Sequence, residues 1–467
     1  MPPASAEITL RTFIGGVGGY GGMAAAIHFK ELIAMKIRGI FLDREKSTEK
    51  SVTIAVPLPE KVIIPMTQCK GQECTPVVKQ GEWVFAGTKI GDGSRMAPIH
   101  SSVSGRVAEI RNMYDSWGNE CSAVVIEADS EQKTAPSSIP SCTDRTSFID
   151  AVRASGCITL DGTAQDTAAL LEKAHDADTL IVNGTESQQY ITNDLRCMMD
   201  NADDILSGIR LIVQYMGIQK TVIALSADFK DAVSAMEKLA QGNEGISVMP
   251  LRADHPNGAE PVLVNNVTGR QIHHGETAAD QKVLVLDTST VAFIGEYFRT
   301  GMPMIKRRIT VDGDLVRTPC SVEIPIGMPI SEVLAFADTN LEAAEKLIIG
   351  GLMNGRTITD PELPMCKGDN ALLVFMKPIE AGKGRLRDGE DSTACIRCGR
   401  CVEACPMGLM PLKIEKAFDK KRLSDLKRLR PDICISCGNC SYVCPAKRDL
   451  TNKVIAAAGY LDRRERD

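Results

Sequence analysis

The sequence has no apolar run of the roughly 18 residues that a membrane-spanning helix needs, and no signal peptide opens it. It also has no excess of positive charge, because 54 Lys and Arg stand against 60 Asp and Glu and leave a net charge of −6. We therefore do not expect a nucleic-acid-binding protein. We expect a cytoplasmic protein, and peripheral association with the inner face of the cell membrane through partners stays open.

Cysteine, in contrast, is abundant, and eight of the 16 cysteines form two equal motifs near the C-terminus. Residues 395–406 read CIRCGRCVEACP and residues 434–445 read CISCGNCSYVCP. Both follow the C-x2-C-x2-C-x3-C-P pattern of bacterial two-cluster ferredoxins, in which the fourth cysteine of each run ligates the other cluster. The pattern predicts two 4Fe–4S clusters with these ligands: Cys395, Cys398, Cys401 and Cys444 for one, and Cys434, Cys437, Cys440 and Cys405 for the other.

Zinc and disulfides are the alternatives for these cysteines. Neither explains two equal runs with a proline after each fourth cysteine. A twin-cluster protein with eight further cysteines also belongs in a reducing compartment.

Between the two motifs lies a basic stretch, Lys413 to Arg430, in which eight of eighteen residues are Lys or Arg. Its apolar residues recur near helical spacing, which predicts an amphipathic helix with a solvated basic face. The alternative that stays open is a docking face for an acidic redox partner.

The rest of the chain divides into several expected domains, since 467 residues exceed one core. Residues 1–50 form a glycine-rich segment with G-x-G-x-x-G at Gly16, Gly18 and Gly21. This order resembles a dinucleotide fingerprint, but no second βα unit follows, which favours a turned glycine loop. Residues 51–130 predict a compact all-β module. Its expected strands are Lys61–Pro65, Glu73–Val78, Trp83–Ile90, Gly105–Ile110 and Ala123–Ala128.

Residues 143–305 change to alternating strands and helices, which predict a parallel sheet. The expected strands are Thr179–Val182, Val222–Leu225, Ile246–Leu251 and Val283–Leu286. The expected helices are Thr167–His175, Leu195–Met216 and Lys230–Gln241. Ligands of such sheets bind at the carboxyl ends of strands, so the polar loop from Asn183 to Tyr190 is the expected small-molecule site. Residues 306–360 predict a small β-grasp module.

In this order the modules resemble the C subunit of the Rnf complex, the membrane-bound ferredoxin:NAD oxidoreductase. The resemblance is carried by PIHSSVSG at 98–105, GAE at 258–260, KLIIGGLMNGR at 346–356 and CIRCGRC at 395–401. It implies a multidomain α/β and β protein, in chain order: a barrel-sandwich hybrid domain (51–130), an α/β domain like the flavin-bearing subunit of complex I (143–305), an SLBB β-grasp domain (306–360) and a helical double 4Fe–4S ferredoxin-type domain (385–450).

The resemblance also implies FMN, NADH and other electron-transfer subunits as cofactor, substrate and partners. Where the family carries G-x-G-G-A-G-F-P-T, residues 156–164 read GCITLDGTA. Side chains with a Cβ obstruct the approach of backbone N–H groups to a phosphate, and Asp161 adds a negative charge there. FMN and NADH binding therefore stay open. The cofactor-binding residues that the motif retains are Asn183 and Glu186, with Asp194 after them.

A second departure replaces the family's Gln-His-Ile-Gly by Gln68-Cys69-Lys70-Gly71, and Cys74 follows. Cys69 and Cys74 beside a basic residue suggest a redox dithiol, and two reduced thiols without a redox role are the alternative. The other cysteines are expected to be structural: Cys121, Cys142, Cys157, Cys197, Cys320 and Cys366.

Three functions stay open from the sequence. The first is an electron-transfer oxidoreductase subunit of Rnf C type. The second is a soluble, NADH-independent relay to a specific reductase, like the electron-transfer protein associated with proline reductase, which resembles the same family. The third is a structural adaptor whose clusters mainly hold the fold.

Overall fold

A four-stranded parallel sheet forms the centre of the α/β region in the computed structural model, which describes residues 39–273, 275–376 and 392–466. Its strand order is β12-β11-β10-β14. The bounds are β10 (Thr179–Gly184), β11 (Lys220–Ser226), β12 (Ile246–Leu251) and β14 (Val283–Asp287). The expected strands of this region are therefore present. The glycine run at Gly16 to Gly21 lies outside the described residues.

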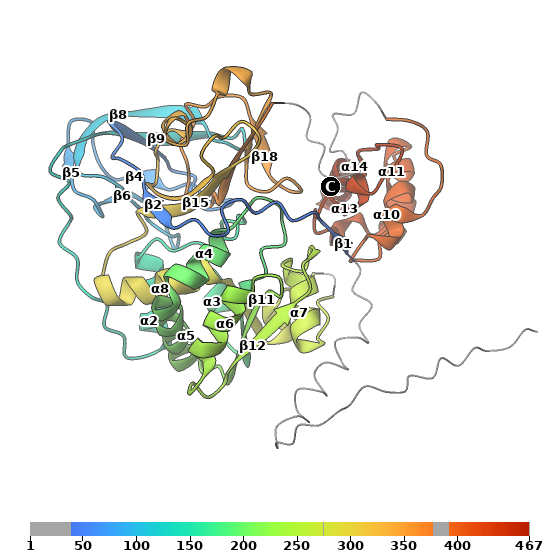
Figure 1. The fold of residues 1–467 in the computed structure, drawn as a ribbon, viewed down its shortest axis with the longest axis horizontal. Coiled ribbons are helices and arrows are strands. Elements are labelled where there is room, and N and C mark those ends of the chain that lie inside the picture. Colours follow the sequence, from blue (N-terminus) through green and yellow to red (C-terminus); the bar gives the residue numbers. More distant parts are fainter. Residues whose placement is uncertain (1–38, 274, 377–391, 467) are drawn as a thin grey trace, which may run out of the picture. The chain divides into compact units, whose positions relative to one another are not determined.

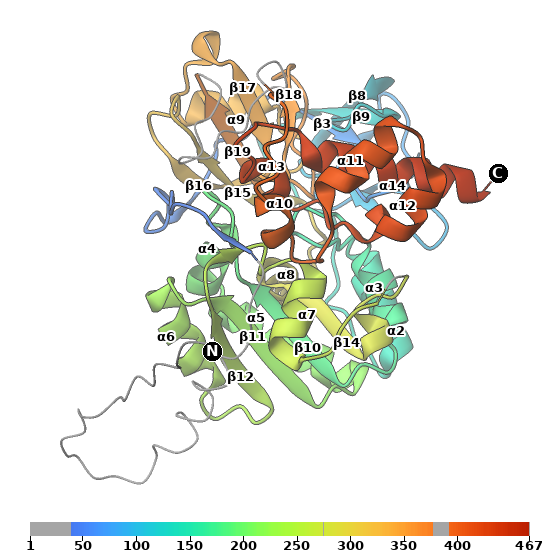
Figure 2. The same cartoon turned by 90° about the vertical axis from the view of Figure 1, so that its right-hand side faces the viewer.

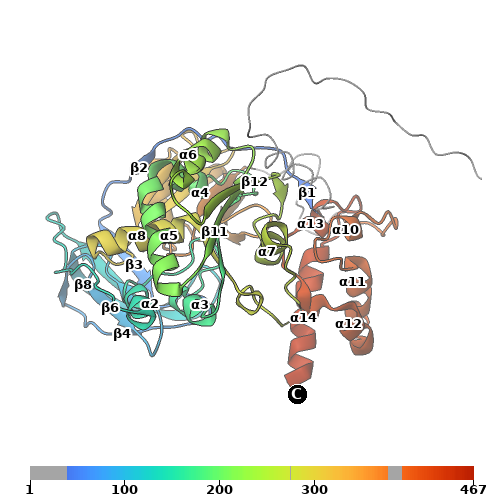
Figure 3. The ribbon, with the colours of Figure 1, turned by 90° about the horizontal axis from the view of Figure 1, so that it is seen from below.

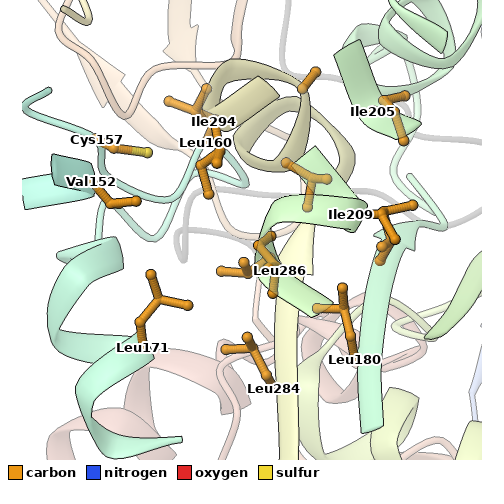
Figure 4. Packing of buried hydrophobic residues seen from close by; sticks show 14 of the residues in the cluster. Val152, Cys157, Leu160, Leu171, Leu180, Ile205, Ile209, Leu284, Leu286 and Ile294 are labelled. Atoms are coloured by element: carbon orange, nitrogen blue, oxygen red, sulfur yellow. The ribbon is translucent and has the colours of Figure 1, made fainter. Parts of the chain in front are cut away.

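Helices cover both faces of this sheet (Figure 1). Side chains alternate along each strand, so Leu180 and Val182 enter one hydrophobic cluster and Ile181 enters another. The first cluster packs against helices α2 (Arg145–Ala154), α3 (Thr167–Lys173), α5 (Ala202–Met216), α6 (Lys230–Ala240) and α8 (Thr288–Thr300). The second packs against α7 (Glu260–Thr268). Figure 4 shows Leu284 and Leu286 of the sheet among side chains of these helices.

The single helix expected over Leu195–Met216 is wrong. The structure has two helices, α4 (Asn193–Asp200) and α5, separated at Asn201. Asn201 has φ −125° and ψ 30°, outside the helical region, and its side-chain oxygen accepts a hydrogen bond of 2.7 Å from Arg308. A residue held by a partner far along the chain interrupts a segment whose apolar periodicity is continuous.

The all-β module consists of two small sheets around one hydrophobic cluster. The four-stranded sheet contains β3 (Lys61–Pro65), β9 (Glu120–Ala128), β8 (Gly105–Tyr114) and β5 (Trp83–Val84), in that order. The three-stranded sheet contains β4 (Thr75–Pro76), β6 (Lys89–Asp92) and β7 (Ile99–His100). The single strand expected over Trp83–Ile90 is wrong, because the chain turns at Gly87, where φ is +91°, and changes sheets.

The β-grasp sheet draws strands from outside residues 306–360. Its order is β18-β17-β19-β15-β16-β2. The bounds are β2 (Thr53–Ala55), β15 (Lys306–Asp312), β16 (Cys320–Pro325), β17 (Lys346–Ile349), β18 (Arg356–Ile358) and β19 (Ala371–Phe375), with helix α9 (Ile330–Phe336) packed on the sheet. Strand β2, which precedes the barrel module in the chain, pairs with β16, and β19 lies in the interior of the sheet.

The cysteine-rich end is helical (Figure 2). Its helices are α10 (Arg400–Glu403), α11 (Pro411–Asp419), α12 (Leu423–Leu429), α13 (Asn439–Tyr442) and α14 (Leu450–Arg466). The continuous amphipathic helix expected over Lys413–Arg430 is wrong, because Lys421 adopts φ +49° between α11 and α12. Figure 3 shows α11 and α12 beside α14, where Ile414, Leu426 and Val454 share one hydrophobic cluster. No helix in the described ranges is long and apolar enough to span a bilayer.

Candidate functional site

Four of the predicted cluster ligands surround one cavity of about 330 Å³, here called the first cavity: Cys395, Cys398, Cys401 and Cys444. Cys395 and Cys398 come from the loop that leads into α10, and Cys401 lies in α10 itself. Arg397 and Gly399 both have positive φ, +57° and +80°, and turn this loop so that its cysteines face inward. Cys444 comes from the second motif, as the crossed pattern predicts.

The other four surround a smaller cavity of about 20 Å³, the second cavity: Cys405, Cys434, Cys437 and Cys440. The loop is built in the same way, with Ser436 at φ +54° and Gly438 at +83° before α13. The structure thus brings together the two sets of cysteines that the sequence grouped.

Backbone N–H groups point at cysteine sulfur atoms in both loops. Arg397 N–H donates to Cys395 Sγ at 3.3 Å, and Ser436 N–H donates to Cys434 Sγ at 3.4 Å. Leu409 N–H donates to Cys405 Sγ at 3.3 Å. Hydrogen bonds to the sulfurs are one of the means by which a protein tunes an iron–sulfur cluster. The two sets of four cysteines and these donors match the ligands and hydrogen bonds that two 4Fe–4S clusters require.

The loop at residues 156–164, by contrast, is closed by its own contacts. Leu160 N–H donates to Asp287 Oδ2 at 3.0 Å, and Thr163 N–H donates to Asp161 Oδ1 at 2.9 Å. Burial, with Asp161 nearby, raises the pKa of Asp287 to about 6. Two carboxylates thus occupy N–H donors that a phosphate would need, and a phosphate would meet like charge. The loop as it stands does not fit the phosphate of FMN.

The three expected cofactor residues lie near one another, but their polar groups form hydrogen bonds within the protein. Asn183 Nδ2 donates to the carbonyl oxygen of Gly258 at 3.1 Å. The Glu186 carboxylate accepts from the N–H groups of Asp194 and Leu195, at 3.0 and 3.1 Å, at the start of α4. Asp194 accepts from Thr288 Oγ1 at 2.7 Å, and burial, with Glu186 next, raises its pKa.

A segment before the barrel covers the polar loop after β10. Lys46 Nζ donates to the carbonyl oxygens of Glu186, at 3.1 Å, and Gln188, at 2.6 Å. Burial lowers the pKa of Lys46 to about 8. The cavity beside this loop is about 30 Å³, whereas small-molecule sites usually measure roughly 300–1,000 Å³. Sequence reasoning missed Lys46 because its partners lie 140 residues or more away.

The two thiols of the expected dithiol are both buried, 7% exposed for Cys69 and 5% for Cys74. Burial raises the pKa of Cys69 to about 12, although nearby Lys367 opposes this effect. Loss of hydration thus outweighs the effect of Lys367 and disfavours the thiolate form of Cys69. The two side chains also join different hydrophobic clusters. A redox role for the pair stays a prediction.

Cys69 also lines a cavity of about 560 Å³ that the sequence did not indicate. The cavity receives residues from the barrel, the 156–164 loop and the β-grasp module, among them Cys366 and Arg356. Arg356 stacks on Trp117, with 4.2 Å from its guanidinium carbon to the ring centroid, and pairs with Asp369. No local sequence pattern predicts this cavity, because the residues that line it come from segments far apart along the chain.

Comparisons with known protein families match four parts of the chain in order. Residues 36–131 match the RnfC barrel sandwich hybrid domain, and residues 152–296 match the Nuo51 FMN-binding domain. Residues 308–337 match the SLBB domain, and residues 394–447 match the 4Fe-4S dicluster domain. These matches confirm the predicted fold classes and their order, and they support the expected cofactors: two 4Fe–4S clusters from the dicluster match, and FMN as a candidate from the Nuo51 match.

Curated relatives match most of the chain. The C subunit of a Na+-translocating ferredoxin:NAD+ oxidoreductase complex from Acetobacterium woodii is 34% identical over 378 residues, 78% of this chain and 84% of that protein. A proton-translocating counterpart from Clostridium ljungdahlii is 30% identical, with 79% of this chain and 81% of that protein covered. The C subunit of an ion-translocating oxidoreductase complex from Rhodobacter capsulatus is 30% identical, with 83% and 75% covered.

Among solved structures, an NAD+-reducing [NiFe]-hydrogenase in its H2-reduced state aligns with a TM-score of 0.46 at 15% identity, over 71% of this chain and 69% of that one. The relatives, together with the N-terminal family match, confirm the resemblance seen in the sequence. The chain belongs to the RnfC family.

Proposed function

We propose that this chain is the electron-transfer iron–sulfur subunit of a ferredoxin:NAD oxidoreductase complex. One observation carries the proposal: eight cysteines form two sets of four, each set around one cavity. We assign Cys395, Cys398, Cys401 and Cys444 as ligands at the first cavity, and Cys405, Cys434, Cys437 and Cys440 as ligands at the second. When bound, such clusters take up and release single electrons.

The chain's own residues prepare both sites. Positive φ at Arg397 and Ser436 aims each loop's N–H groups at a cysteine sulfur, and the glycines that follow begin a short helix. These donors favour the deprotonated sulfur that iron requires and adjust the potential of each centre. We infer that the clusters held by the two loops differ in reduction potential, because one loop is more buried than the other.

The complex supplies the context for this role. The relatives from A. woodii and C. ljungdahlii are named as subunits of ion-translocating ferredoxin:NAD+ oxidoreductase complexes. We propose that the present chain joins a complex of this kind and reaches the membrane through its partner subunits. The described residues offer no membrane-spanning helix of their own for that purpose.

In this proposal a partner subunit, and not an FMN bound to the α/β domain, exchanges electrons with the clusters. The loop at residues 156–164 does not fit a phosphate, because Asp161 and Asp287 hold its N–H groups. We therefore propose no electron transfer through an FMN of this chain.

The iron content of the anaerobically reconstituted chain tests the assignment. We expect about eight irons per chain, as two 4Fe–4S clusters require. Cys142→Ser is a matched control, because this thiol is only partly buried and lies outside both sets, so the variant should keep its iron. A wild-type content near zero would contradict the proposal.

Anaerobic mixing with NADH, followed by bleaching of the cluster absorbance, tests how electrons enter. We expect dithionite to reduce the protein and NADH to leave it oxidised, even with FMN supplied. Rapid bleaching by NADH with FMN would show that the α/β domain accepts hydride and would overturn the partner-fed entrance. Failure of dithionite to reduce the protein would contradict the electron-transfer role itself and leave the structural adaptor.

A further inference from the structure

The two copies of the cysteine motif have the same sequence pattern but opposite exposure. In the first copy Ile396 to Arg400 are all exposed, and Cys398 is the one exposed cysteine of the eight. In the second copy Ile435 to Cys437 are partly buried, and Gly438 to Cys440 are buried. The first cavity therefore lies at the surface, and the second is turned toward the protein.

The second copy is packed against the rest of the chain. His255 Nε2 lies 2.8 Å from the backbone oxygen of Cys437. Asn439 Nδ2 donates to the backbone oxygen of His255 at 3.1 Å. Gly438 leaves no room for a Cβ beside the carbonyl oxygen of Met353, and Tyr442 packs against a cluster that includes Ile348. These contacts cover Gly438 to Cys440 and leave the second loop less accessible to a protein partner than the first.

The first copy presents a different surface, which we call the first rim: Ile396, Arg397, Arg400, Val402, Met410 and Lys413. Its three apolar side chains, 66%, 37% and 41% exposed for Ile396, Val402 and Met410, all line the first cavity. Apolar side chains of this size at a surface pocket, with charged side chains around them, are the anatomy of a protein–protein interface.

The charge of the first rim is positive and not neutralised. Arg397, Arg400 and Lys413 form no ion pair with any residue that the structure describes, and Glu403 is the single carboxylate between residues 395 and 413. The neighbouring helix α11 extends the basic surface, because both of its carboxylates are paired with basic side chains from outside the helix. Glu415 pairs with Arg448, and Asp419 pairs with Lys453, each at 2.7 Å.

Cations at a cluster could also serve only to offset its negative charge. The second copy argues against this explanation. It holds the same four-cysteine set, yet Ser436 and Asn439 stand at the places of Arg397 and Arg400. A cluster in this fold thus needs no arginine at these positions, and the arginines occur only where the loop faces solvent.

We propose that the first rim docks a small acidic electron-carrier protein, so that electrons pass between this chain and its carrier at the first cavity. The proposal rests on the electron-transfer function proposed above. The chain as a whole carries a net charge of −6, so an acidic carrier would be repelled elsewhere and guided to this surface. The second cavity then forms the inner end of the path, beside His255.

Binding to a purified acidic two-cluster ferredoxin, measured by titration calorimetry with the full-length holoprotein, tests the proposal. The variant Arg397→Ser/Arg400→Asn installs the residues of the second copy, which are compatible with the same loop. We expect its Kd to rise about tenfold at low ionic strength, as loss of rim charges at an interface weakens steering. Wild-type binding should weaken with added salt, and variant binding should change less.

Lys230→Gln/Lys238→Gln on α6 is the matched control, since both lysines are exposed and the change in charge is the same. This variant should bind the ferredoxin like the wild type. Lys413→Gln lies on α11 outside the cysteine loop and gives a second measurement if the loop variant loses iron. It should also weaken binding.

Stopped-flow reduction separates this proposal from the function on which it rests. Reduced ferredoxin should reduce the loop variant about tenfold more slowly than the wild type, because fewer productive encounters form. Reduced methyl viologen, a small cation that needs no docking, should reduce Lys413→Gln and the wild type equally. Equal ferredoxin affinity and equal salt dependence in all three variants would overturn the docking surface. Clusters that methyl viologen fails to reduce in the wild type would instead contradict the electron-transfer function.

Discussion

Buried carboxylates are the feature that most clearly distinguishes the α/β domain of this chain at the scale of single residues. Asp287 accepts from Leu160 N–H and from the Thr290 hydroxyl, at 3.0 and 2.6 Å. Glu186 and Asp194 are satisfied in the same way by neighbouring N–H and hydroxyl groups. Burial raises the pKa of Asp287 and of Asp194, so this region holds negative charge poorly. An anionic ligand would add to the cost.

His100 gives a pH-dependent prediction at the same scale. The side chain is 7% exposed, its Nδ1 has no hydrogen-bond partner within the described residues, and burial beside Lys367 and Lys89 lowers its pKa to about 3. The unfolded chain takes up a proton near pH 6.5, whereas the folded chain stays neutral. Stability is therefore present above pH 6.5 and is lost as the pH falls toward 3.

Between pH 7 and pH 5 this difference amounts to about 2 kcal/mol of unfolding free energy, from the linkage relation. We expect the free energy of unfolding to fall by that much more in the wild type than in His100→Gln over the same pH interval. Urea unfolding followed by tryptophan fluorescence measures it, because both tryptophans, Trp83 and Trp117, lie in the barrel module with His100. Equal losses in the two proteins would show that His100 is not held neutral.

At the scale of elements, two glycines set how closely α5 and α8 pack. A Cβ at Gly208 of α5 would collide with the carbonyl oxygen of Val291, and one at Gly295 of α8 with that of Asp204. Backbone cannot move aside as a flexible side chain can. The two helices therefore approach each other at backbone contact, and this contact fixes α8 over the sheet.

Gly295→Ala should separate α5 from α8 and cost roughly 3 kcal/mol, at the upper end of overpacking penalties. Gly459→Ala in α14 is the matched control, because its nearest neighbour is the end of Arg463 at 3.8 Å. That change should raise helix stability by about 1 kcal/mol. Hydrogen exchange of the two helices measures both effects locally: exchange should accelerate in α5 and α8 for the first variant and slow in α14 for the second. Unchanged exchange in α5 would contradict the close packing.

The elements also show what local pattern could and could not predict. The strands of the parallel sheet were predictable, because a short apolar run between turns is by itself the sequence signal of a buried strand. The break at Asn201 and the pairing of β2 with β16 were not, because both depend on residues more than a hundred positions away. The same limit explains the site. The cysteine spacing contains the two ligand sets, whereas the contact of Asp287 with Leu160, 127 residues apart, has no trace in either segment.

At the scale of the whole molecule, the two motifs form one unit rather than two successive ones. Cys444 of the second motif lines the first cavity, and Cys405 of the first motif lines the second. Asn439 Nδ2 donates to the backbone oxygen of Ala404, beside Cys405, at 3.2 Å. Neither motif can therefore complete its site alone, and the buried second site must form for the exposed first one to be held in place.

Pairs of Cys→Ser variants distinguish crossed from successive ligation. Crossed ligation places Cys398 and Cys444 at one cluster, so Cys398→Ser/Cys444→Ser should keep about four irons, one full 4Fe–4S cluster. Cys398→Ser/Cys405→Ser removes one ligand from each cluster and should keep almost none. Successive ligation predicts the reverse, because Cys398 and Cys405 would then share a cluster. Each double variant carries two substitutions, so a general loss of stability would lower the iron content of both. The difference in iron content between them therefore reports the ligation pattern. An iron content that is higher in Cys398→Ser/Cys405→Ser would refute the crossed arrangement and, with it, the inward and outward ends of the electron path.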